Sequence, residues 1–253
     1  MQPSASMTFR GAHAYVLGAS SDIGMATALL LRNAGLKLTL SAASKKGVLR
    51  LAAAFPEARN LELNLQTIAA DTARKSDTAP ALFEGLEPPD YLIDCMQSDF
   101  EAFIAGADPV AAAHYLTTNI SARAVCLREI SRRMLAKRFG RCVFTSSTAA
   151  SVPNAGQGYY AAAKQAGETL YRSLGAELAG RGVTTCSLRL GYVESGRGKR
   201  YLQQHPDVHD RIPAKRAITP DEAARTILFL LSDAAAMINA TNITMDGGLT
   251  ACK

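Results

Sequence analysis

The sequence predicts a doubly wound α/β domain, with helices on both faces of a parallel sheet of about seven strands. Short apolar runs alternate with helical segments along the chain, and this alternation is typical of crossover connections between parallel strands. A glycine-rich turn follows the first apolar run, where doubly wound sheets bind their ligands. The 253 residues suit one core. We therefore expect a flexible lead over 1–10 and one domain over 11–253.

In the first half of the chain, turn-forming residues separate the expected elements. Gly35 and Pro56 each end a helical pattern, because glycine is favoured just after a helix and proline cannot continue one. The expected strands are 13–18, 36–41, 60–65 and 89–96, and the expected helices are 22–35, 48–55 and, with poor definition, 67–84.

In the second half, two long helical patterns flank a strand that ends in two serines. An irregular segment over 192–217 follows the sixth strand, and its glycines could act as hinges, so we expect it to form a substrate lid. The expected helices are 108–138, 158–180 and 219–232, and the expected strands are 141–147, 183–191 and 240–248.

The composition is that of an ordinary globular protein, 48% apolar and 20% charged with a net charge of +6. No apolar run is long enough to span a membrane, and the first residues do not resemble a secretory signal. Five dispersed cysteines indicate reduced thiols and a cytoplasmic protein.

The basic runs at 127–141 and 197–201 are either solvated faces or attract an anionic substrate or carrier. Without zinc spacing or aromatic-basic interleaving, we expect neither a metal nor a nucleic acid.

The stretch "GASSDIG" at 18–24 is a candidate phosphate-binding turn. Such a turn presents free backbone N–H groups and the positive end of a helix dipole to a phosphate. A glycine turn alone is a weak signal, since it also serves close packing, but its place after the first strand strengthens it. We expect Asp22 to cap the following helix through its side chain.

Tyr160 and Lys164 lie four residues apart with only small residues between them, so both side chains project from one helix face. The pair alone indicates little, because this spacing is common on helix surfaces. Ser147 ends the fifth expected strand thirteen residues before Tyr160, and Asn119 lies in the helix before that strand. Together with the glycine turn, these residues favour an active site over an ordinary helix.

Seven motifs occur in a fixed order along residues 10–250. They are "GASSDIG" (18–24), "LNL" (63–65), "TTNISA" (117–122), "SS" (146–147), "YAAAK" (160–164), "LGYVES" (190–195) and "MDGG" (245–248). As an ordered set they resemble the short-chain dehydrogenases/reductases, and within them the 3-oxoacyl-acyl-carrier-protein reductases. The resemblance implies a single Rossmann-type domain and an NAD(P)H-dependent ketoreductase.

The resemblance also implies a role for each site residue. Tyr160 would donate the proton with Lys164 as its partner, Ser147 would bind the substrate oxygen, and Asn119 would hold a structural water. The cofactor-binding positions that it implies are Gly18, Ser20, Ser21, Ile23, Gly24, Ala43, Ser44, Asn64, Leu65, Cys95, Tyr160, Lys164, Gly191 and Val193.

Elementary chemistry supports the Tyr–Lys pair. Hydride delivery to a carbonyl leaves negative charge on its oxygen, so a proton donor is needed there. A free phenol has a pKa of about 10, and we expect the Lys164 ammonium to lower the pKa of Tyr160. The small residues at 161–163 would let the cofactor approach the helix.

The end of the second expected strand bears on the choice of cofactor. It has no carboxylate to grip the ribose 2′-hydroxyl of NAD, and none follows before Glu57. The run Ser41 to Ser44, with Lys45 and Lys46, could accept a 2′-phosphate, so NADP(H) is preferred over NAD(H). Alternatively, the two lysines only begin a surface helix.

Residues 94–97, "DCMQ", depart from the Asn-Asn-Ala-Gly of the family. Met96 and Gln97 are bulkier than Ala and Gly, and we expect them to crowd the ribose of the cofactor unless the loop is displaced. A non-catalytic partner subunit with impaired cofactor binding therefore stays open as an alternative function.

The resemblance implies a substrate class and an assembly. Arg138 and Arg181 match positions that contact the acidic carrier in carrier-protein reductases, so a β-ketoacyl thioester on acyl carrier protein or coenzyme A is the expected substrate. An alcohol dehydrogenase acting on a free small molecule is the alternative. A homotetramer or homodimer formed through the helices at 108–138 and 158–180 is expected.

Overall fold

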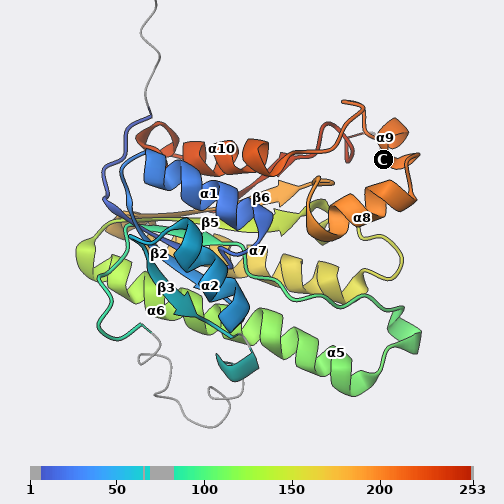
Figure 1. The fold of residues 1–253 in the computed structure, drawn as a ribbon, viewed down its shortest axis with the longest axis horizontal. Helices are drawn as coiled ribbons and strands as arrows, with labels where there is room; N and C mark the ends of the chain where they lie inside the picture. Colours follow the sequence, from blue (N-terminus) through green and yellow to red (C-terminus); the bar gives the residue numbers. More distant parts are fainter. Residues whose placement is uncertain (1–6, 65, 69–82, 252–253) are drawn as a thin grey trace, which may run out of the picture.

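Seven parallel strands form one sheet in the computed structural model, which describes residues 7–64, 66–68 and 83–251. The strand order is β3-β2-β1-β4-β5-β6-β7, so the predicted doubly wound fold is confirmed (Figure 1). The order reverses between β1 and β4, and ligands bind at such a switch point. The strands are β1 (His13–Leu17), β2 (Lys37–Ala42), β3 (Arg59–Glu62), β4 (Tyr91–Asp94), β5 (Gly140–Ser147), β6 (Val183–Leu190) and β7 (Thr241–Met245).

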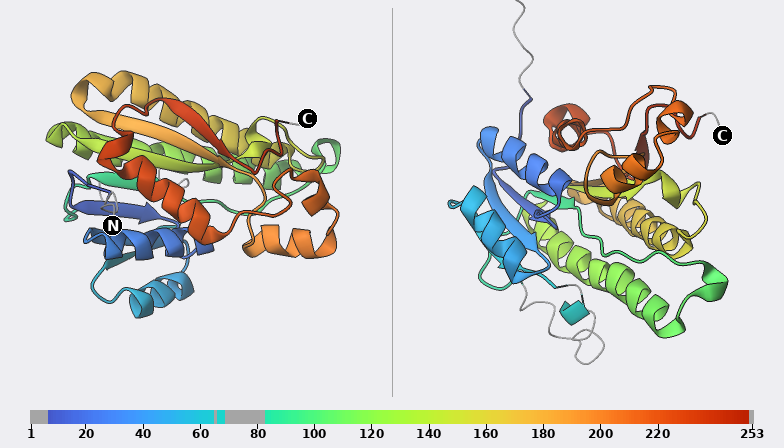
Figure 2. Two further views of the ribbon diagram at one scale, coloured as in Figure 1. Left: turned by 90° about the horizontal axis from the view of Figure 1, so that it is seen from above. Right: turned by 45° about the vertical axis from the view of Figure 1, so that its right-hand side comes forward.

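Helices cover both faces of the sheet, as the views in Figures 1 and 2 show. On one face lie α1, α2 and α10; on the other lie α6 and α7, with α5 leading into α6. The helices are α1 (Asp22–Asn33), α2 (Lys45–Ala54), α5 (Pro109–Leu116), α6 (Ala122–Lys137), α7 (Gly158–Leu178), α8 (Gly196–Gln204), α9 (Val208–Arg211) and α10 (Pro220–Leu231).

Strand side chains alternate between the two faces, as strand geometry requires. Ala14 and Val16 of β1 pack with α1 and α10 in one apolar cluster. Tyr15 and Leu17 pack with α6 and α7 in a second cluster on the other face. Because both faces of the sheet are buried, the loops after the strands are left to form a site.

The predicted helix over 108–138 is interrupted. A π-helical turn, η2 (Thr117–Ser121), joins α5 to α6 and contains Asn119. The Ala122 N–H donates to the carbonyl of Thr117, five residues earlier, instead of four as in an α-helix. The prediction of one regular helix is wrong at this turn, because a single π turn leaves the apolar pattern almost unchanged.

We predicted an irregular segment over 192–217, but the structure has two short helices there, α8 and α9. Leu202, Val208 and Ile212 bury their side chains in a small cluster with Leu249, from near the end of the chain. This segment, the predicted lid, therefore has a small apolar cluster of its own beside the main sheet.

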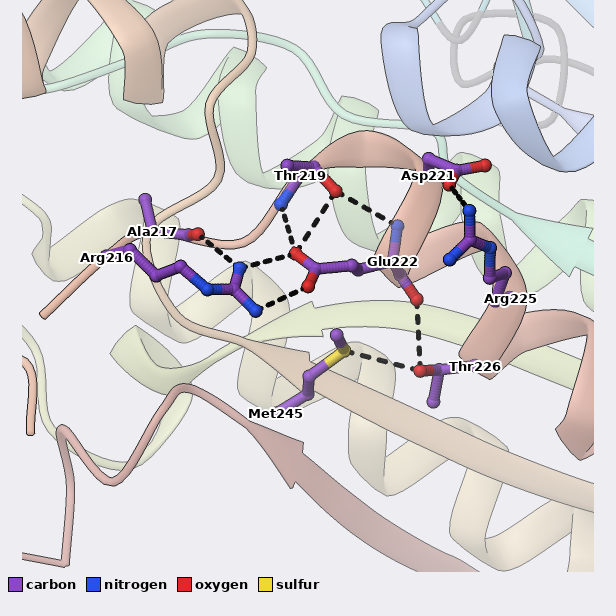
Figure 3. A network of polar contacts seen from close by, with 8 residues as sticks. All are labelled: Arg216, Ala217, Thr219, Asp221, Glu222, Arg225, Thr226 and Met245. Carbon is purple, nitrogen blue, oxygen red and sulfur yellow. Dashed lines mark hydrogen bonds and ion pairs between the residues drawn. The ribbon is translucent and has the colours of Figure 1, made fainter. Parts of the chain in front are cut away.

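A polar network anchors the lid segment where it enters α10 (Figure 3). Arg216 donates to both carboxylate oxygens of Glu222, at 2.8 and 2.6 Å. The Thr219 hydroxyl accepts from the Glu222 N–H at 3.2 Å, and the Thr219 N–H donates to the Glu222 carboxylate at 2.9 Å, which is a capping box. The Arg216 hydrogen bonds, followed by those of Thr219, lower the pKa of Glu222 to about 2. The carboxylate thus stays ionised, and the anchor persists, at neutral pH.

Residues 8–10 belong to the domain, although we predicted a flexible lead over 1–10. The Thr8 carbonyl accepts a hydrogen bond from the Asp233 N–H at 2.9 Å. The predicted helix over 67–84 lies for the most part outside the described residues.

Candidate active site

Gly18 seats the glycine-rich turn against the loop that follows β4. Its φ is +71°, and a Cβ added to it would lie 2.8 Å from the carbonyl carbon of Cys95, so only glycine fits. The Gly18 N–H donates to the hydroxyl of Ser41 at 3.2 Å. A Cβ on Gly24 would lie 2.7 Å from the Gly18 carbonyl oxygen. The turn is therefore held tightly between the carboxyl ends of β1, β2 and β4.

Ser21, and not Asp22 as predicted, caps α1. The Ser21 hydroxyl accepts from the Gly24 N–H at 3.1 Å, whereas Asp22 is the first residue of the helix. The Asp22 carboxylate lies 3.9 Å from the guanidinium of Arg50. Its charge therefore has a cationic neighbour at the start of the helix.

Two adjoining cavities lie at the carboxyl ends of the strands, with volumes of about 180 and 410 Å³. Ser21, Cys95 and Gln97 line both of them, so the cavities share a wall. The smaller one is also lined by Ile23, Thr145, Ser146, Ser147, Tyr160, Lys164, Leu190, Gly191, Val193 and Arg197. The larger one is also lined by Gly18, Ser20, Ala43, Leu63, Asn64, Gln66, Met96, Ser98 and Thr118.

Most of the predicted cofactor positions thus converge on one cleft. Gly24 and Ser44 line neither cavity, because Gly24 packs within the turn and Ser44 caps α2. Leu65 lies outside the described residues. The convergence joins the segments that follow β1, β2, β3, β4 and β6 with α7, which the order of motifs alone could not establish.

The polar groups of this cleft fit a phosphate-bearing dinucleotide. The first turn of α1 leaves backbone N–H groups without intrahelical partners next to Ser20 and Ser21. Within the described ranges, neither cavity is lined by an Asp or Glu. Gln97 Oε1 and Thr118 Oγ1 are buried without a partner and belong to residues that line the larger cavity. Buried polar atoms normally have a partner, and the polar groups of a bound ligand would supply one.

Ser147, Tyr160 and Lys164 meet at the smaller cavity. Ser147 is the last residue of β5, and α7 carries the other two. Ser147 lies close enough to Tyr160 for its hydroxyl to act on the pKa of the phenol. Lys164 Nζ lies 5.7 Å from the centroid of the Tyr160 ring and donates to the Thr145 carbonyl at 2.8 Å. Two hydroxyl groups and an amine therefore face one space.

Burial dominates the protonation of this centre. Burial raises the pKa of Tyr160, while the Ser147 hydrogen bond and the Arg197 charge act in the opposite direction. Burial, reinforced by the Arg123 charge, lowers the pKa of Lys164 to about 7. The expectation that the Lys164 ammonium lowers the pKa of the phenol is therefore wrong in this structure, because burial disfavours both charged forms.

Asn119 is buried outside both cavities. Its side-chain amide donates to the Ser98 hydroxyl at 2.6 Å and to the Tyr115 carbonyl at 2.9 Å. Its side-chain oxygen accepts from the Ser98 N–H at 3.0 Å. Asn119 thus joins the π turn to the loop after β4, and its role in holding a structural water stays a prediction.

A buried ion pair organises the divergent residues 94–97. Arg123 Nε donates to Asp94 Oδ2 at 2.8 Å, and both side chains are excluded from solvent. Arg123 also donates to the carbonyl of Met96, whose side chain packs in the core beneath α6. Met96 also lines the larger cavity and Gln97 lines both, so the expected crowding of the cofactor ribose by these two residues stays a prediction.

The residues expected at a 2′-phosphate have different environments. Ser41 is buried and bonded to the glycine turn, so its predicted part in binding a phosphate is wrong. Ala43 lines the larger cavity, and Ser44 accepts a hydrogen bond from the first turn of α2. Lys45 and Lys46 are exposed on that first turn.

Two arginines near the cleft were not singled out from the sequence. Arg50 donates to the Ser20 carbonyl at 3.2 Å, and its spacing of four residues from Lys46 was a signal for a shared helix face. Arg197 of α8 lies over the Tyr160 ring, with Cζ 5.1 Å from the centroid. Nothing in the pattern of the lid distinguished Arg197 from its basic neighbours.

Arg138 and Arg181 lie at the opposite ends of the strands from the cavities. Arg138 lies two residues before β5 and Arg181 two residues before β6, so both lie at the amino ends of strands. Ser147 lies at the other end of β5, and a strand of eight residues spans about 25 Å. Within one chain, these arginines are therefore remote from a group bound at Tyr160.

Fold and site together define a doubly wound nucleotide-binding protein. A family model described as enoyl-(acyl carrier protein) reductase matches residues 18–250. The 3-oxoacyl-[acyl-carrier-protein] reductase FabG of Escherichia coli strain K12 is 27% identical over 245 residues, covering 96% of this chain and 99% of its own. The 3-oxoacyl-[acyl-carrier-protein] reductase of Synechocystis sp. is 29% identical over 250 residues, covering 93% and 96%.

Solved structures share the same fold. A short chain dehydrogenase/reductase family protein superposes with a TM-score of 0.84 at 24% identity, over 96% of this chain and all of that one. An oxidoreductase of the same family from Burkholderia thailandensis gives a TM-score of 0.80 at 23% identity, over 95% and 93%. The chain belongs to the short-chain dehydrogenase/reductase family of oxidoreductases. In the part of the chain that is described, no helix has the length and apolarity needed to cross a membrane.

Proposed function

We propose that this protein reduces the ketone of a 3-oxoacyl thioester to the hydroxyl, with NADPH as the preferred cofactor. The observation that carries the proposal is the meeting of Ser147, Tyr160 and Lys164 at a cavity that adjoins the phosphate-binding turn. The names of the curated relatives support the substrate class. A cytoplasmic location is part of the proposal, and it agrees with the cysteines in the described part of the chain being unpaired thiols: Cys95, Cys126, Cys142 and Cys186.

The residues of the chain handle the proton and the oxygen, and a bound nicotinamide supplies the hydride. Ser147 would hold the carbonyl oxygen beside Tyr160. Because burial raises the pKa of Tyr160, its phenol keeps its proton at neutral pH and is ready to donate. An alkoxide is more basic than a phenolate, so transfer is favourable once charge develops on the substrate oxygen. Lys164, with a pKa of about 7, exchanges protons near neutrality and is suited to restore the phenol.

The preference for NADPH rests on the rim of the larger cavity. Ala43 and Ser44 follow β2, and no carboxylate stands at that strand end within the described residues. Lys45, Lys46 and Arg50 add positive charge on α2, where a 2′-phosphate would be attracted.

Docking of an acidic carrier would involve a second copy of the chain. Arg138 and Arg181 are exposed, but they lie at the amino ends of β5 and β6, away from Tyr160. A homodimer or homotetramer that packs α6 and α7 against their symmetry copies in antiparallel fashion would bring these arginines toward the cavity of the neighbour. We propose such an assembly as the form that accepts carrier-linked substrate.

Cofactor binding and turnover test the proposal together. NADPH and NADH are titrated by fluorescence, and cofactor oxidation is then followed with a 3-oxoacyl thioester or a 2-enoyl thioester. We expect tighter binding of NADPH, and oxidation only with the 3-oxoacyl compound. Turnover of the enoyl compound alone would assign reduction of a C=C bond instead. No binding of either cofactor at millimolar concentration would favour the non-catalytic partner subunit.

A further inference from the structure

Arg197 brings a guanidinium from the lid to the candidate proton donor. It projects from α8, lines the smaller cavity with Ser147 and Lys164, and lies over the ring of Tyr160 with Cζ 5.1 Å from the centroid. Its side chain is 31% exposed, so it is neither sealed in the core nor free in solvent. The proposed mechanism gives this side chain no task.

Two exposed carboxylates form ion pairs with the guanidinium. Arg197 Nε lies 3.0 Å from Asp99 Oδ1, and Nη1 lies 3.3 Å from Glu101 Oε1. Both acidic side chains follow β4 and are more than half exposed, at 68% and 52%. Among the described residues, none accepts a hydrogen bond from Nη2. Because the guanidinium is planar and its fork is rigid, the two ion pairs fix the direction of this remaining donor.

The other cation of the cavity is already engaged. Lys164 Nζ donates to the Thr145 carbonyl at 2.8 Å and is buried. Of the described residues that line the smaller cavity, Lys164 and Arg197 are the basic ones. Arg197 therefore offers the unpaired cationic donor nearest to the space where a ketone would meet Tyr160.

We infer that Arg197 Nη2 donates a hydrogen bond to a second oxygen of the substrate, the thioester carbonyl of a 3-oxoacyl group, and so selects compounds that carry this oxygen two carbons from the ketone. The inference rests on the proposed function and names the part of the substrate that Arg197 contacts. A charge-assisted donor of this kind discriminates by about ten- to hundredfold between substrates with and without the accepting oxygen.

The charge of the cluster favours a neutral carbonyl over a carboxylate. One guanidinium and two carboxylates carry a formal charge of −1, so Asp99 and Glu101 would repel the anion of a free 3-oxo acid. A thioester carbonyl accepts the same hydrogen bond without that repulsion. The 3-oxoacyl thioester is thus the preferred partner of Arg197.

The test compares kcat/KM for three substrates of equal length: a neutral short-chain 3-oxoacyl thioester, the free 3-oxo acid and a simple ketone without the second oxygen. The ketone is used at high concentration so that its slow turnover is measurable. In Arg197→Met, we expect the thioester-to-ketone ratio of kcat/KM to fall about ten- to hundredfold, with partial recovery in Arg197→Lys. Arg200→Met, at an exposed position of the same helix, is the matched control and should keep the ratio.

Each other outcome decides against the inference. An equal loss for thioester and ketone in Arg197→Met would mean that Arg197 acts through Tyr160 or the lid. A wild-type preference for the free acid over the thioester would overturn the choice of a neutral carbonyl. An unchanged ratio with an active wild type would overturn the inference and leave the proposed function standing. A wild type that binds NADPH but reduces none of the three would remove both.

Discussion

At the scale of the residue, Lys164 is a buried amine one helical turn from a buried phenol. It donates to the Thr145 carbonyl, and its Nζ lies 5.1 Å from the centroid of the Phe144 ring. These contacts replace the hydration of an ammonium only in part, which is why its pKa falls to about 7. Burial also raises the pKa of Tyr160, so the phenol is protonated before a substrate binds.

The low pKa of Lys164 predicts a pH-dependent stability. An unfolded lysine has a pKa of about 10.4, against about 7 in the fold. Between these values the unfolded chain holds a proton that the folded chain has lost, so the free energy of unfolding rises with pH. Relative to Lys164→Met, the wild type should gain stability from pH 7 to 9.5 and show a constant difference below pH 6, as measured by urea unfolding. A difference that stays flat up to pH 9.5 would contradict the burial of a titrating amine, and Lys199→Met, which is exposed, serves as control.

At the scale of the element, one buried ion pair joins β4 to α6. Asp94 ends β4, and Arg123 lies in the first turn of α6, beside the π turn. Asp94 also accepts from the Tyr171 hydroxyl at 3.2 Å, so the pair links α7 as well. Because Arg123 donates to the carbonyls of Met96 and Asn119, the pair shapes the wall of the cofactor cleft without lining it.

A double-mutant cycle tests this pair. Asp94→Asn leaves a buried guanidinium without its counter-ion and should lower the free energy of unfolding by about 3–5 kcal/mol. Adding Arg123→Met to Asp94→Asn removes the uncompensated charge and should recover at least about half of that loss. Asp221→Asn, which breaks the exposed pair with Arg225 (Figure 3), should have an effect close to zero. Additive losses in the double variant would contradict a buried, coupled pair.

The parts of the fold that could be predicted are those with local signals. The strands and helices have periods that single segments display, and Gly18, Ser147 and Tyr160 follow from turns and spacing at strand and helix ends. The π turn at Asn119 could not be predicted, because one extra residue in a helical turn leaves no mark in the apolar pattern. The two helices of the lid were missed since their polar sequence hides a small cluster that forms only with Leu249.

The residues that meet at the smaller cavity were predictable from the sequence, but their electrostatics were not. The spacing of Tyr160 and Lys164 indicated nearness, yet spacing carries no information on burial, which decides both pKa values. Asp94 and Arg123 lie 29 residues apart, so their pairing depends on the packing of β4 against α6. Arg197 reaches Tyr160 through the path of the lid, and that path is a property of the folded chain.

At the scale of the whole molecule, the cavities and the proposed carrier-binding arginines lie at opposite ends of the strands. The cavities lie at the carboxyl ends of the strands, while Arg138 and Arg181 lie at the amino ends of β5 and β6. A carrier held by these arginines can serve an active site only in a neighbouring copy of the chain. The proposed assembly and the proposed carrier are therefore linked.

Mixed assemblies test this link. Arg138→Glu should raise KM for carrier-linked substrate about tenfold, and Tyr160→Phe should turn over about 10²- to 10⁴-fold more slowly. In an assembly of the two variants, an intact Tyr160 in one chain would meet an intact Arg138 from the other, so a low KM should return. A KM that stays high in the mixed assembly, or a wild type that is monomeric by size-exclusion chromatography with light scattering, would exclude docking across copies.

The most direct measurement of the central claim is the single-turnover rate of NADPH oxidation with a 3-oxoacyl thioester in Tyr160→Phe. With the proton donor removed, we expect a loss of about 10²- to 10⁴-fold while NADPH binding by fluorescence stays unchanged. Tyr159→Phe, which alters the neighbouring tyrosine that packs on Phe100, is the matched control and should keep the wild-type rate. Turnover in Tyr160→Phe at the rate of that control would show that the proton comes from another group.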